Sequence, residues 1–420
     1  MTISALERNP VKVGDIGNAA GAKLVTSAIR DFQSLTAIRD EWADLVRAAG
    51  AGSPFAHPAW SLTWAQHFVP EHDLEFVAIR EGDDTGRLVG MAPFYRRHRS
   101  LGRFTMTTVQ PIGTGQGEAL TEGVHLVALP ERARDVLCAV VQHVAALPDS
   151  DWAQVSVGDG QGWPLAQWLD GDSAGMIHHR KTRPSVVIDD LPDDPEQVLP
   201  GLKRNLRESL RRARNRSKKM GDIAFRSVSD PVDVASAIRE IIRLHTLRSE
   251  MEGKVAHANM LGGSIDRFLG DAAVQLAREG LATVQLAEHA GVPVAAQLVL
   301  SDGTTDYISV SGLDPKYWDL NLNTMLIFRA VQDAVTSGRR SVNLSTGPNV
   351  AKMRWSSTVV THHDFDIVPG GRRSQIVHEL YSHAATAWDT HKERRRHRVL
   401  DDRGSWKTLL RNRGGSRGNQ

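Results

Sequence analysis

The chain has 420 residues, which is long enough for two domains that each bury a core of their own. Hydrophobic residues make up 41% and charged residues 24%, and the net charge of +2 is too small to indicate a nucleic-acid partner by itself. The single cysteine, Cys138, excludes an internal disulfide and a thiol-rich metal cluster.

The first residues show no apolar signal segment, and no apolar run approaches the roughly 20 residues that span a bilayer. We therefore expect a cytoplasmic protein without a transmembrane segment. Residues 1–24 are rich in Gly and Ala without a clear period, which predicts a flexible leader. A strand is expected at Leu24–Phe32 and an amphipathic helix at Ala37–Ala49.

An internal duplication is predicted from two hairpins. Leu74–Arg97 consists of an apolar strand ending in Glu, a Gly-containing turn and a Val-containing strand, and Leu281–Leu300 has the same layout. Two similar halves follow, at residues 25–190 and 195–370, with a helical and then basic tail at 371–420. Between the first helices and the first hairpin, Trp60 and Trp64 share a helical face, which favours core packing over the wall of a substrate cleft.

A glycine-rich segment follows the first hairpin. Gln110, Gly113 and Gly115 match the acyl-CoA pyrophosphate motif, but that motif works only where its glycines open a helix. A strand-like run follows here, which favours a flexible turn. Further along, Cys138 lies in the predicted helix Arg132–Ala146 and is interpreted as a small buried apolar residue. Short strands are expected at Ala153–Val157 and Ser185–Ile188.

The segment Leu202–Met220 predicts a strongly basic helix. Its narrow apolar stripe consists of Leu202, Leu206, Leu210 and Ala213, and Lys or Arg occupies most other positions. Three interpretations stay open: binding of RNA phosphates, contact with an anionic membrane surface, and a solvated helix packed by its leucines. Further helices are expected from Pro231 and from Ser264, the first of them carrying His245 and Arg248 near a cleft, where a structural histidine is favoured.

The stretch from Leu281 to Trp355 organises the second half. Three strands are expected at Leu281–Glu288, Val292–Leu300 and Thr304–Ser311, joined by tight turns into an antiparallel meander. A helix at Asn323–Ser337 and strands at Ser341–Ser345 and Val359–Val368 follow.

This order resembles the core of the GNAT acyltransferase superfamily, in its cellulose-biosynthesis-type acetyltransferase branch, which borders the Fem-type peptidoglycan aminoacyltransferases. The resemblance covers about residues 50–370 and is carried by Gly312–Trp318, the helix after it, Gly347–Trp355 and Leu202–Arg207. It implies an α/β (α+β) protein with tandem GNAT-like domains, each a mixed, mostly antiparallel sheet flanked by helices.

The resemblance also implies where an acyl-CoA donor is held. Its carbonyl would lie where Thr304–Ser311 and Ser341–Ser345 part, with the pyrophosphate near Asn321–Met325. Asn323 stands where relatives carry glycine, and it caps a helix well but crowds an approaching phosphate. The expected cofactor-binding residues are Ser311, Gly312, Asn321, Asn323 and Thr324.

For the chemistry, Asp306 or a relayed water is the candidate base, and Tyr307 or Tyr317 the candidate acid for the leaving thiolate. Lys352 and Arg354 lie in a loop that could close on an anionic group. Asn343 occupies a position where many relatives carry an acidic residue.

Metal chemistry is not expected. His378, Glu379 and His383 form HExxxH, which places the two histidines on different helical faces, and His362 and His363 point to opposite faces of a strand.

The leading functional hypothesis is an acyltransferase that moves an acyl group from acetyl-CoA or another acyl-CoA to the amine of a sugar, cell-envelope precursor or small metabolite. The alternatives are a Fem-like transferase that uses aminoacyl-tRNA bound through Leu202–Met220, and a non-catalytic protein that binds a glycan or partner.

Overall fold

The structure is a computed structural model that describes residues 23–384, except for 51–52, 102–103, 116–119, 123–125, 159–175, 222 and 252–259. The predicted leader, apart from its last two residues, and the basic tail beyond residue 384 lie outside the described residues.

The N-terminal half begins with β1 (Leu24–Ile29) and continues through α1 (Phe32–Ala37), α2 (Arg39–Ala49), α3 (Pro58–Phe68), β2 (Leu74–Glu81), β3 (Leu88–Leu101), β4 (Phe104–Pro111), β5 (Val127–Ala128), α4 (Ala133–Ala145), β6 (Trp152–Gly158) and β7 (Met176–Ile188). Helix formation starts earlier than the apolar pattern predicted, because Asp31 caps α1 by accepting a 2.7 Å hydrogen bond from Ser34 N. Strand β7 is much longer than the predicted Ser185–Ile188.

The C-terminal half contains α6 (Val198–Gly201), α7 (Arg204–Met220), β8 (Ile223–Val228), α8 (Pro231–Ser249), α9 (Ser264–Arg278), β9 (Ala282–His289), β10 (Val292–Ser301), β11 (Thr305–Leu313), α10 (Leu322–Thr336), β12 (Ser341–Thr346), α11 (Val350–Met353) and β13 (Val359–Val368). The predicted elements from Leu281 onward agree with these bounds within one or two residues. Strand β8 was not predicted, since it alternates only weakly between buried and exposed residues.

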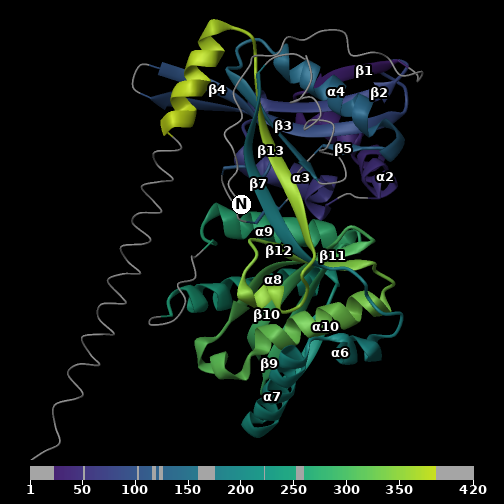
Figure 1. Ribbon diagram of the computed structural model, residues 1–420, viewed down its shortest axis with the longest axis vertical. Helices are drawn as coiled ribbons and strands as arrows, with labels where there is room; N and C mark the ends of the chain where they lie inside the picture. Colours follow the sequence, from purple (N-terminus) through teal and green to yellow (C-terminus); the bar gives the residue numbers. More distant parts are fainter. Residues whose placement is uncertain are drawn as a thin grey trace, which may run out of the picture.

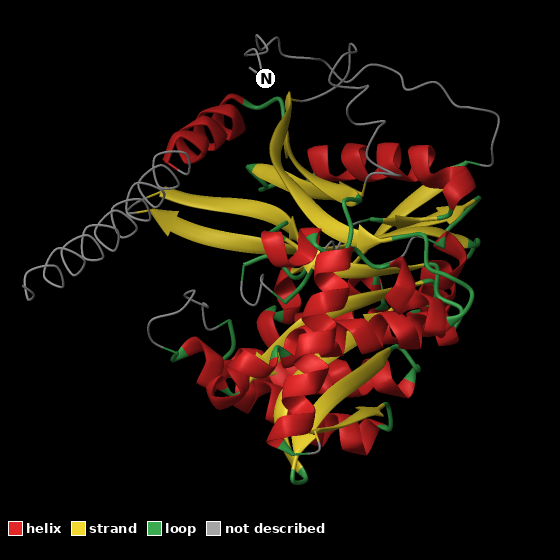
Figure 2. Cartoon of the chain, turned by 60° about the horizontal axis from the view of Figure 1, so that its bottom comes forward, coloured by secondary structure: helices red, strands yellow, loops and turns green. Residues whose placement is uncertain are grey.

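All strands form one sheet in the order β1-β2-β3-β4-β6-β13-β7-β12-β11-β10-β9-β8, with β5 paired to β3. Each half starts with four antiparallel strands, and a helical crossover, α4 or α10, then leads to a parallel neighbour, β6 or β12. The predicted tandem arrangement of mixed, mostly antiparallel sheets is therefore confirmed. Figure 2 shows helices covering the faces of this sheet.

The two halves share their central strands. Strand β13, from the C-terminal half, lies between β6 and β7, while β7 also pairs with β12. In Figure 1 these two long strands run side by side from one half into the other.

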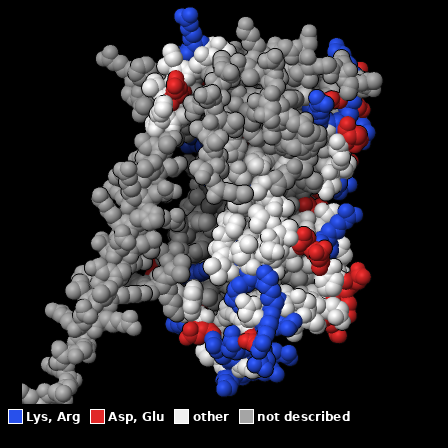
Figure 3. Space-filling view, in the orientation of Figure 1, with Lys and Arg blue, Asp and Glu red and all other residues white. Residues whose placement is uncertain are grey.

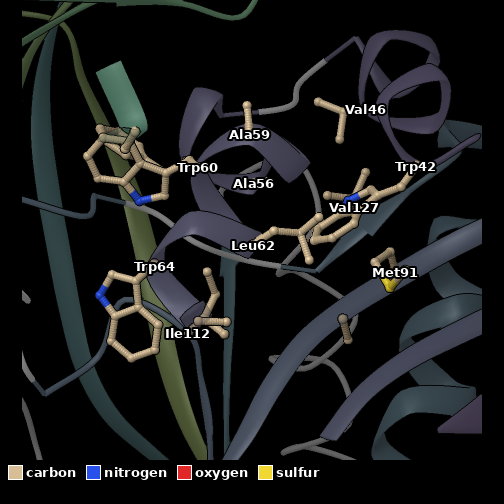
Figure 4. Close-up of a cluster of buried hydrophobic side chains, with 14 of the residues drawn as sticks. Trp42, Val46, Ala56, Ala59, Trp60, Leu62, Trp64, Met91, Ile112 and Val127 are labelled. Carbon is tan, nitrogen blue, oxygen red and sulfur yellow. The ribbon is translucent and has the colours of Figure 1, made fainter. Parts of the chain in front are cut away.

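The largest hydrophobic cluster also continues across both halves. Trp60 and Trp64 on α3 are 0% and 1% exposed, which confirms their assignment to the core (Figure 4). The Trp60 ring meets Phe268 of α9 edge to face, with ring centroids 4.9 Å apart. Helix α3 thus joins the two halves through aromatic packing.

After β13, a helix at 372–384 packs beside the β3–β4 ribbon, where Arg99 Nη1 donates to the Tyr381 hydroxyl at 2.9 Å. His378 Nε2 lies 3.0 Å from Asp366 Oδ2 and is nearly buried. Within the described residues no group of three or more His, Cys, Asp or Glu side chains could hold a metal ion. No helix in that part of the chain is long and apolar enough to cross a membrane.

Candidate active site

The sheet opens between β11 and β12. These strands pair in parallel only from Thr305↔Ser341 to Tyr307↔Asn343, after which β11 stays with β10 and β12 stays with β7. The opening begins within Thr304–Ser311 and Ser341–Ser345, the two segments between which the donor carbonyl was expected to lie. A flat acyl group can lie in such an opening because the strand edges still offer backbone donors and acceptors.

Helix α10 packs against β11 and β12, and its first turn borders a pocket. Its N-cap, Asn321, adopts a left-handed φ of 56°, and its Nδ2 donates to Ser209 Oγ of α7 at 3.1 Å. A cavity of about 270 Å³ lies between α7 and the helix start, and it is lined by Ser209, Arg212, Ala213, Arg216, Trp318, Asp319 and Asn321.

The pocket is suited to an anion. Arg212 and Arg216 are one turn apart on α7, and both side chains are exposed. The guanidinium of Arg216 donates to the backbone carbonyl of Asp319, a residue that lies in the chain just before α10. Two guanidinium groups beside the positive end of a helix favour a phosphate, which can accept hydrogen bonds from both.

Of the expected cofactor-binding residues, only Asn321 lines this pocket. Thr324 Oγ1 donates back to Asn321 Oδ1 at 2.9 Å, so it supports the cap. Asn323 Oδ1 is buried and accepts no hydrogen bond from a described residue. Their roles in cofactor binding stay predictions.

Ser311 and Gly312 pack against α8. The Ser311 carbonyl lies 3.1 Å from His245 Nδ1, and Met260 N donates to His245 Nε2 at 3.3 Å. His245 is therefore a buried structural histidine, as favoured from the sequence. A Cβ on Gly312 would lie 2.5 Å from Leu244 Cβ and 2.6 Å from His245 N.

We expect Gly312→Ala to destabilise the protein by about 1–3 kcal/mol, because backbone and side chain of α8 must move away from the added methyl group. Chemical denaturation would measure the change. Gly370→Ala is the control, because a Cβ there meets nothing within 4 Å. Equal stability of the two variants would contradict the close packing of β11 on α8.

Two of the four expected catalytic residues are held away from the end of β12. Asp306 is 8% exposed, and its carboxylate lies 3.2 Å from Arg339 Nε, beyond the C-terminal end of α10. Burial raises the pKa of Asp306. The Tyr317 hydroxyl lies 2.8 Å from His289 Nδ1 at the end of β9.

The other two lie closer to the opening. Tyr307 is the last β11 residue paired to β12, and its hydroxyl donates to Asp302 Oδ2 at 3.0 Å. Burial, followed by the negative charges of Asp302 and Glu122, raises the pKa of Tyr307 well above its usual value. Lys352 Nζ donates to the carbonyls of Ser345 and Thr346 at 3.1 and 2.6 Å. Arg354 follows as the C-cap of α11.

Sequence analysis missed Glu122, which comes from the N-terminal half. Its carboxylate accepts hydrogen bonds from the Ser345 hydroxyl, from Thr346 N at 3.0 Å and from Thr346 Oγ1 at 3.3 Å. It thus reaches the end of β12 across more than 200 residues of sequence. A lone acidic residue after a glycine-rich segment carries no local signal of this contact.

The motif at Gln110, Gly113 and Gly115 does not open a helix among the described residues. Gln110 lies in β4, one residue before its end, and accepts a hydrogen bond from the Tyr95 hydroxyl at 3.2 Å, and both glycines have positive φ. Residues 116–119 lie outside the described part. The turn interpretation fits this geometry better than a phosphate-binding helix start.

Comparison with known proteins gives a family for part of the chain. Residues 204–353, which include α7, the pocket and the opening, match the model of the acetyltransferase (GNAT) domain family. No curated protein matches the chain.

Several solved structures are similar. FemX is 12% identical with a TM-score of 0.56, over 81% of this chain and 98% of that chain. The C-terminal domain (DUF2156) of a putative lysylphosphatidylglycerol synthetase from Agrobacterium fabrum is 12% identical with a TM-score of 0.47, over 83% and 96%. A tandem GNAT protein from the clavulanic acid biosynthesis pathway is 14% identical with a TM-score of 0.45, over 83% and 99%.

Identities this low show likeness of fold alone, and only FemX among these three is similar enough in structure to support an argument. Residues 204–353 are therefore similar to the acetyltransferase (GNAT) domain family, and the chain as a whole has a fold like that of FemX.

Proposed function

We propose that the protein is an N-acyltransferase that moves the acyl group of an acyl-CoA to the amine of a sugar, cell-envelope precursor or small metabolite. The observation that carries this proposal is the pocket at the start of α10, where Arg212, Arg216 and the helix N-terminus converge. The resemblance to the cellulose-biosynthesis-type branch agrees with it. We further propose that this transfer takes place in the cytoplasm.

The layout suits a donor with a phosphate group at one end and a reactive carbonyl at the other. The pocket would hold the pyrophosphate, and the parted strands β11 and β12 would hold the thioester. Backbone groups at the opening would then stabilise the oxyanion that develops on the carbonyl oxygen.

A second candidate is a Fem-like transferase with an aminoacyl-tRNA donor, which one observation favours. Helix α7 carries eight Lys and Arg residues, and they extend well beyond the two that line the pocket. Figure 3 shows this basic surface over α7 at the end of the C-terminal half. Such a surface would also suit an RNA backbone. A non-catalytic protein that binds a glycan or partner is the third candidate.

Thermal unfolding with acetyl-CoA, desulfo-CoA or bulk tRNA tests the donor. A donor at a hundredfold excess over its dissociation constant stabilises the folded protein by about 2.7 kcal/mol. Arg212→Ala with Arg216→Ala should weaken CoA binding by about 10-fold or more, because each charge-assisted hydrogen bond contributes about 1.5–3 kcal/mol.

Arg211→Ala with Arg214→Ala is the matched control, since both residues are exposed on α7 outside the pocket. Loss of CoA stabilisation in both double variants would contradict the pocket assignment. Stabilisation of the wild type by tRNA alone would replace acyl-CoA with the aminoacyl donor, and no effect of either ligand would favour the binding protein.

A further inference from the structure

Three segments meet where β12 ends. Glu122 arrives from the N-terminal half, Ser345 and Thr346 end β12, and Lys352 returns from α11. The carboxylate of Glu122 accepts from the side chains of Ser345 and Thr346, while Lys352 Nζ donates to the backbone carbonyls of the same two residues. A negative and a positive group are thus held against one short piece of backbone.

This piece of backbone is strained. Ser345 has a φ of 76°, a left-handed conformation that is uncommon for residues other than glycine. Such strain persists where surrounding contacts impose it, and it is concentrated at functional sites. The hydrogen bonds from Ser345 and Thr346 to Glu122 are contacts of this kind.

The position of Glu122 relates it to the proposed donor site. Asn343 is the last β12 residue paired to β11, and the Glu122 contacts lie two and three residues further along β12. Ser53 Oγ donates to the Glu122 carbonyl at 3.3 Å, and Phe55 packs edge to face on Tyr307 with ring centroids 6.1 Å apart. The N-terminal half therefore lies directly against the opening between β11 and β12.

We propose that Glu122 is the proton acceptor of the acyl transfer, so that the N-terminal half supplies a catalytic residue to the site in the C-terminal half. This assignment rests on the proposed function. Asp306, the carboxylate expected from the sequence, is held by Arg339 beyond the far end of α10. Glu122 has no arginine partner in the described part of the chain.

The step balances without another reactant. The lone pair of the amine nitrogen forms a bond to the thioester carbonyl carbon, and the carbon–sulfur bond breaks with its electron pair going to sulfur. The amine arrives as an ammonium group, and the Glu122 carboxylate takes the proton that frees this lone pair and passes it to solvent. The second proton, which nitrogen loses when the new bond forms, passes through solvent to the CoA thiolate. Lys352, beside the same carboxylate, would stabilise negative charge that develops at the carbonyl oxygen.

The electrostatics suit a base. Burial raises the pKa of Glu122, and the hydrogen bonds from Ser345 and Thr346 and the charge of Lys352 only partly oppose this shift. Burial also lowers the pKa of Lys352. A carboxylate with a raised pKa accepts a proton more effectively near neutral pH than an exposed one does.

Glu122→Gln tests the assignment with acetyl-CoA and four amines: glucosamine, ethanolamine, spermidine and hydroxylamine. Thiol release is measured across pH. General base catalysis typically contributes about 100-fold or more, so we expect that loss with ethanolamine and spermidine, which are protonated at neutral pH. Hydroxylamine is already unprotonated and should lose less than about 10-fold. In the variant the pH–rate profile should follow the free-amine fraction of each substrate alone, and the further limb set by Glu122 should disappear.

The control is Glu288→Gln, a carboxylate on β9 paired with Arg226 at the outer edge of the sheet, which should leave every rate unchanged. CoA stabilisation against heat is measured for each protein, so that binding and chemistry are separated. Equal loss with all four amines and an unchanged pH profile would make Glu122 only a structural contact between the halves, and would overturn the proposal.

Two further outcomes separate the proposals. If the wild type binds CoA and releases thiol with none of the amines, the Glu122 assignment fails while the donor pocket stands. If the wild type neither binds CoA nor releases thiol, the acyl-CoA function fails, and the assignment that rests on it fails too.

Discussion

Trp60→Ala should destabilise the protein by about 3–5 kcal/mol, the usual cost of removing a buried tryptophan. Trp60 is fully buried, and its ring contacts Phe55 and Phe268 edge to face at 5.0 and 4.9 Å. Its Nε1 also donates to Thr121 Oγ1 at 3.2 Å, and Thr121 directly precedes Glu122 in the chain. The substitution would therefore loosen the contact between the halves and the position of Glu122 together.

Chemical denaturation would measure this loss, with Trp60→Phe as the control that keeps an aromatic ring and should lose less. The double variant Trp60→Ala, Phe268→Ala should fall short of the sum of the single losses by about 0.5–3 kcal/mol, because the two rings share one contact. Strict additivity would show that the halves are not coupled through this pair.

Glu75→Gln should cost about 3 kcal/mol near neutral pH and little at pH 2. The Glu75 side chain is 0% exposed and accepts hydrogen bonds from Arg30 at 2.8 and 3.0 Å and from Arg96 at 2.9 Å. Burial alone would raise its pKa, but the nearby His143, whose Nε2 lies 3.6 Å from the carboxylate, and the hydrogen bonds from Arg30 and Arg96 outweigh burial and lower the pKa to about 2.

The pH dependence of stability depends on the difference between the pKa of Glu75 in the folded and in the unfolded protein. The folded-state pKa of Glu75 lies below its ordinary value of 4.5, so its contribution is fully present above pH 4.5 and is lost as the pH falls through about 2. A shift of this size, at 1.36 kcal/mol for each pKa unit, corresponds to about 3 kcal/mol. Unfolding free energies measured across this pH range would test it.

Glu279→Gln is the control, because Glu279 pairs with Arg39 at the surface and should change stability by about 1 kcal/mol or less at any pH. A difference between wild type and Glu75→Gln that stays constant from pH 7 to pH 2 would contradict the depressed pKa.

Much of the fold was predictable from local sequence. Hairpins such as that of β9 and β10 show clear alternation and a Gly turn, and α8 has Asp230 and Pro231 at its start. The length of β7 was not predictable, because its segment His178–Pro184 is polar and at least half of it is exposed. Pairing with β13 keeps that polar segment extended, and such a long-range partner has no local signal.

The site was predictable in outline only. The helix start at Asn321 and the loop of Lys352 follow from motifs close in sequence. Arg212 was recognised as part of a basic helix, but its place in the pocket depends on how α7 packs beside Trp318. The place of Glu122 in the site depends on contact between the two halves. Its partners lie more than 200 residues away in the sequence, so no local pattern indicates this contact.

The exchange of central strands has a consequence for synthesis on the ribosome. The N-terminal half cannot complete its sheet when its own residues emerge, because the strand between β6 and β7 is β13, the last strand of the C-terminal half to be made. Until then β6 and β7 expose unpaired edges, and such edges promote association with other chains. The first half to be made is therefore the last to be finished, and a nascent chain of this fold spends most of its translation as an incomplete sheet.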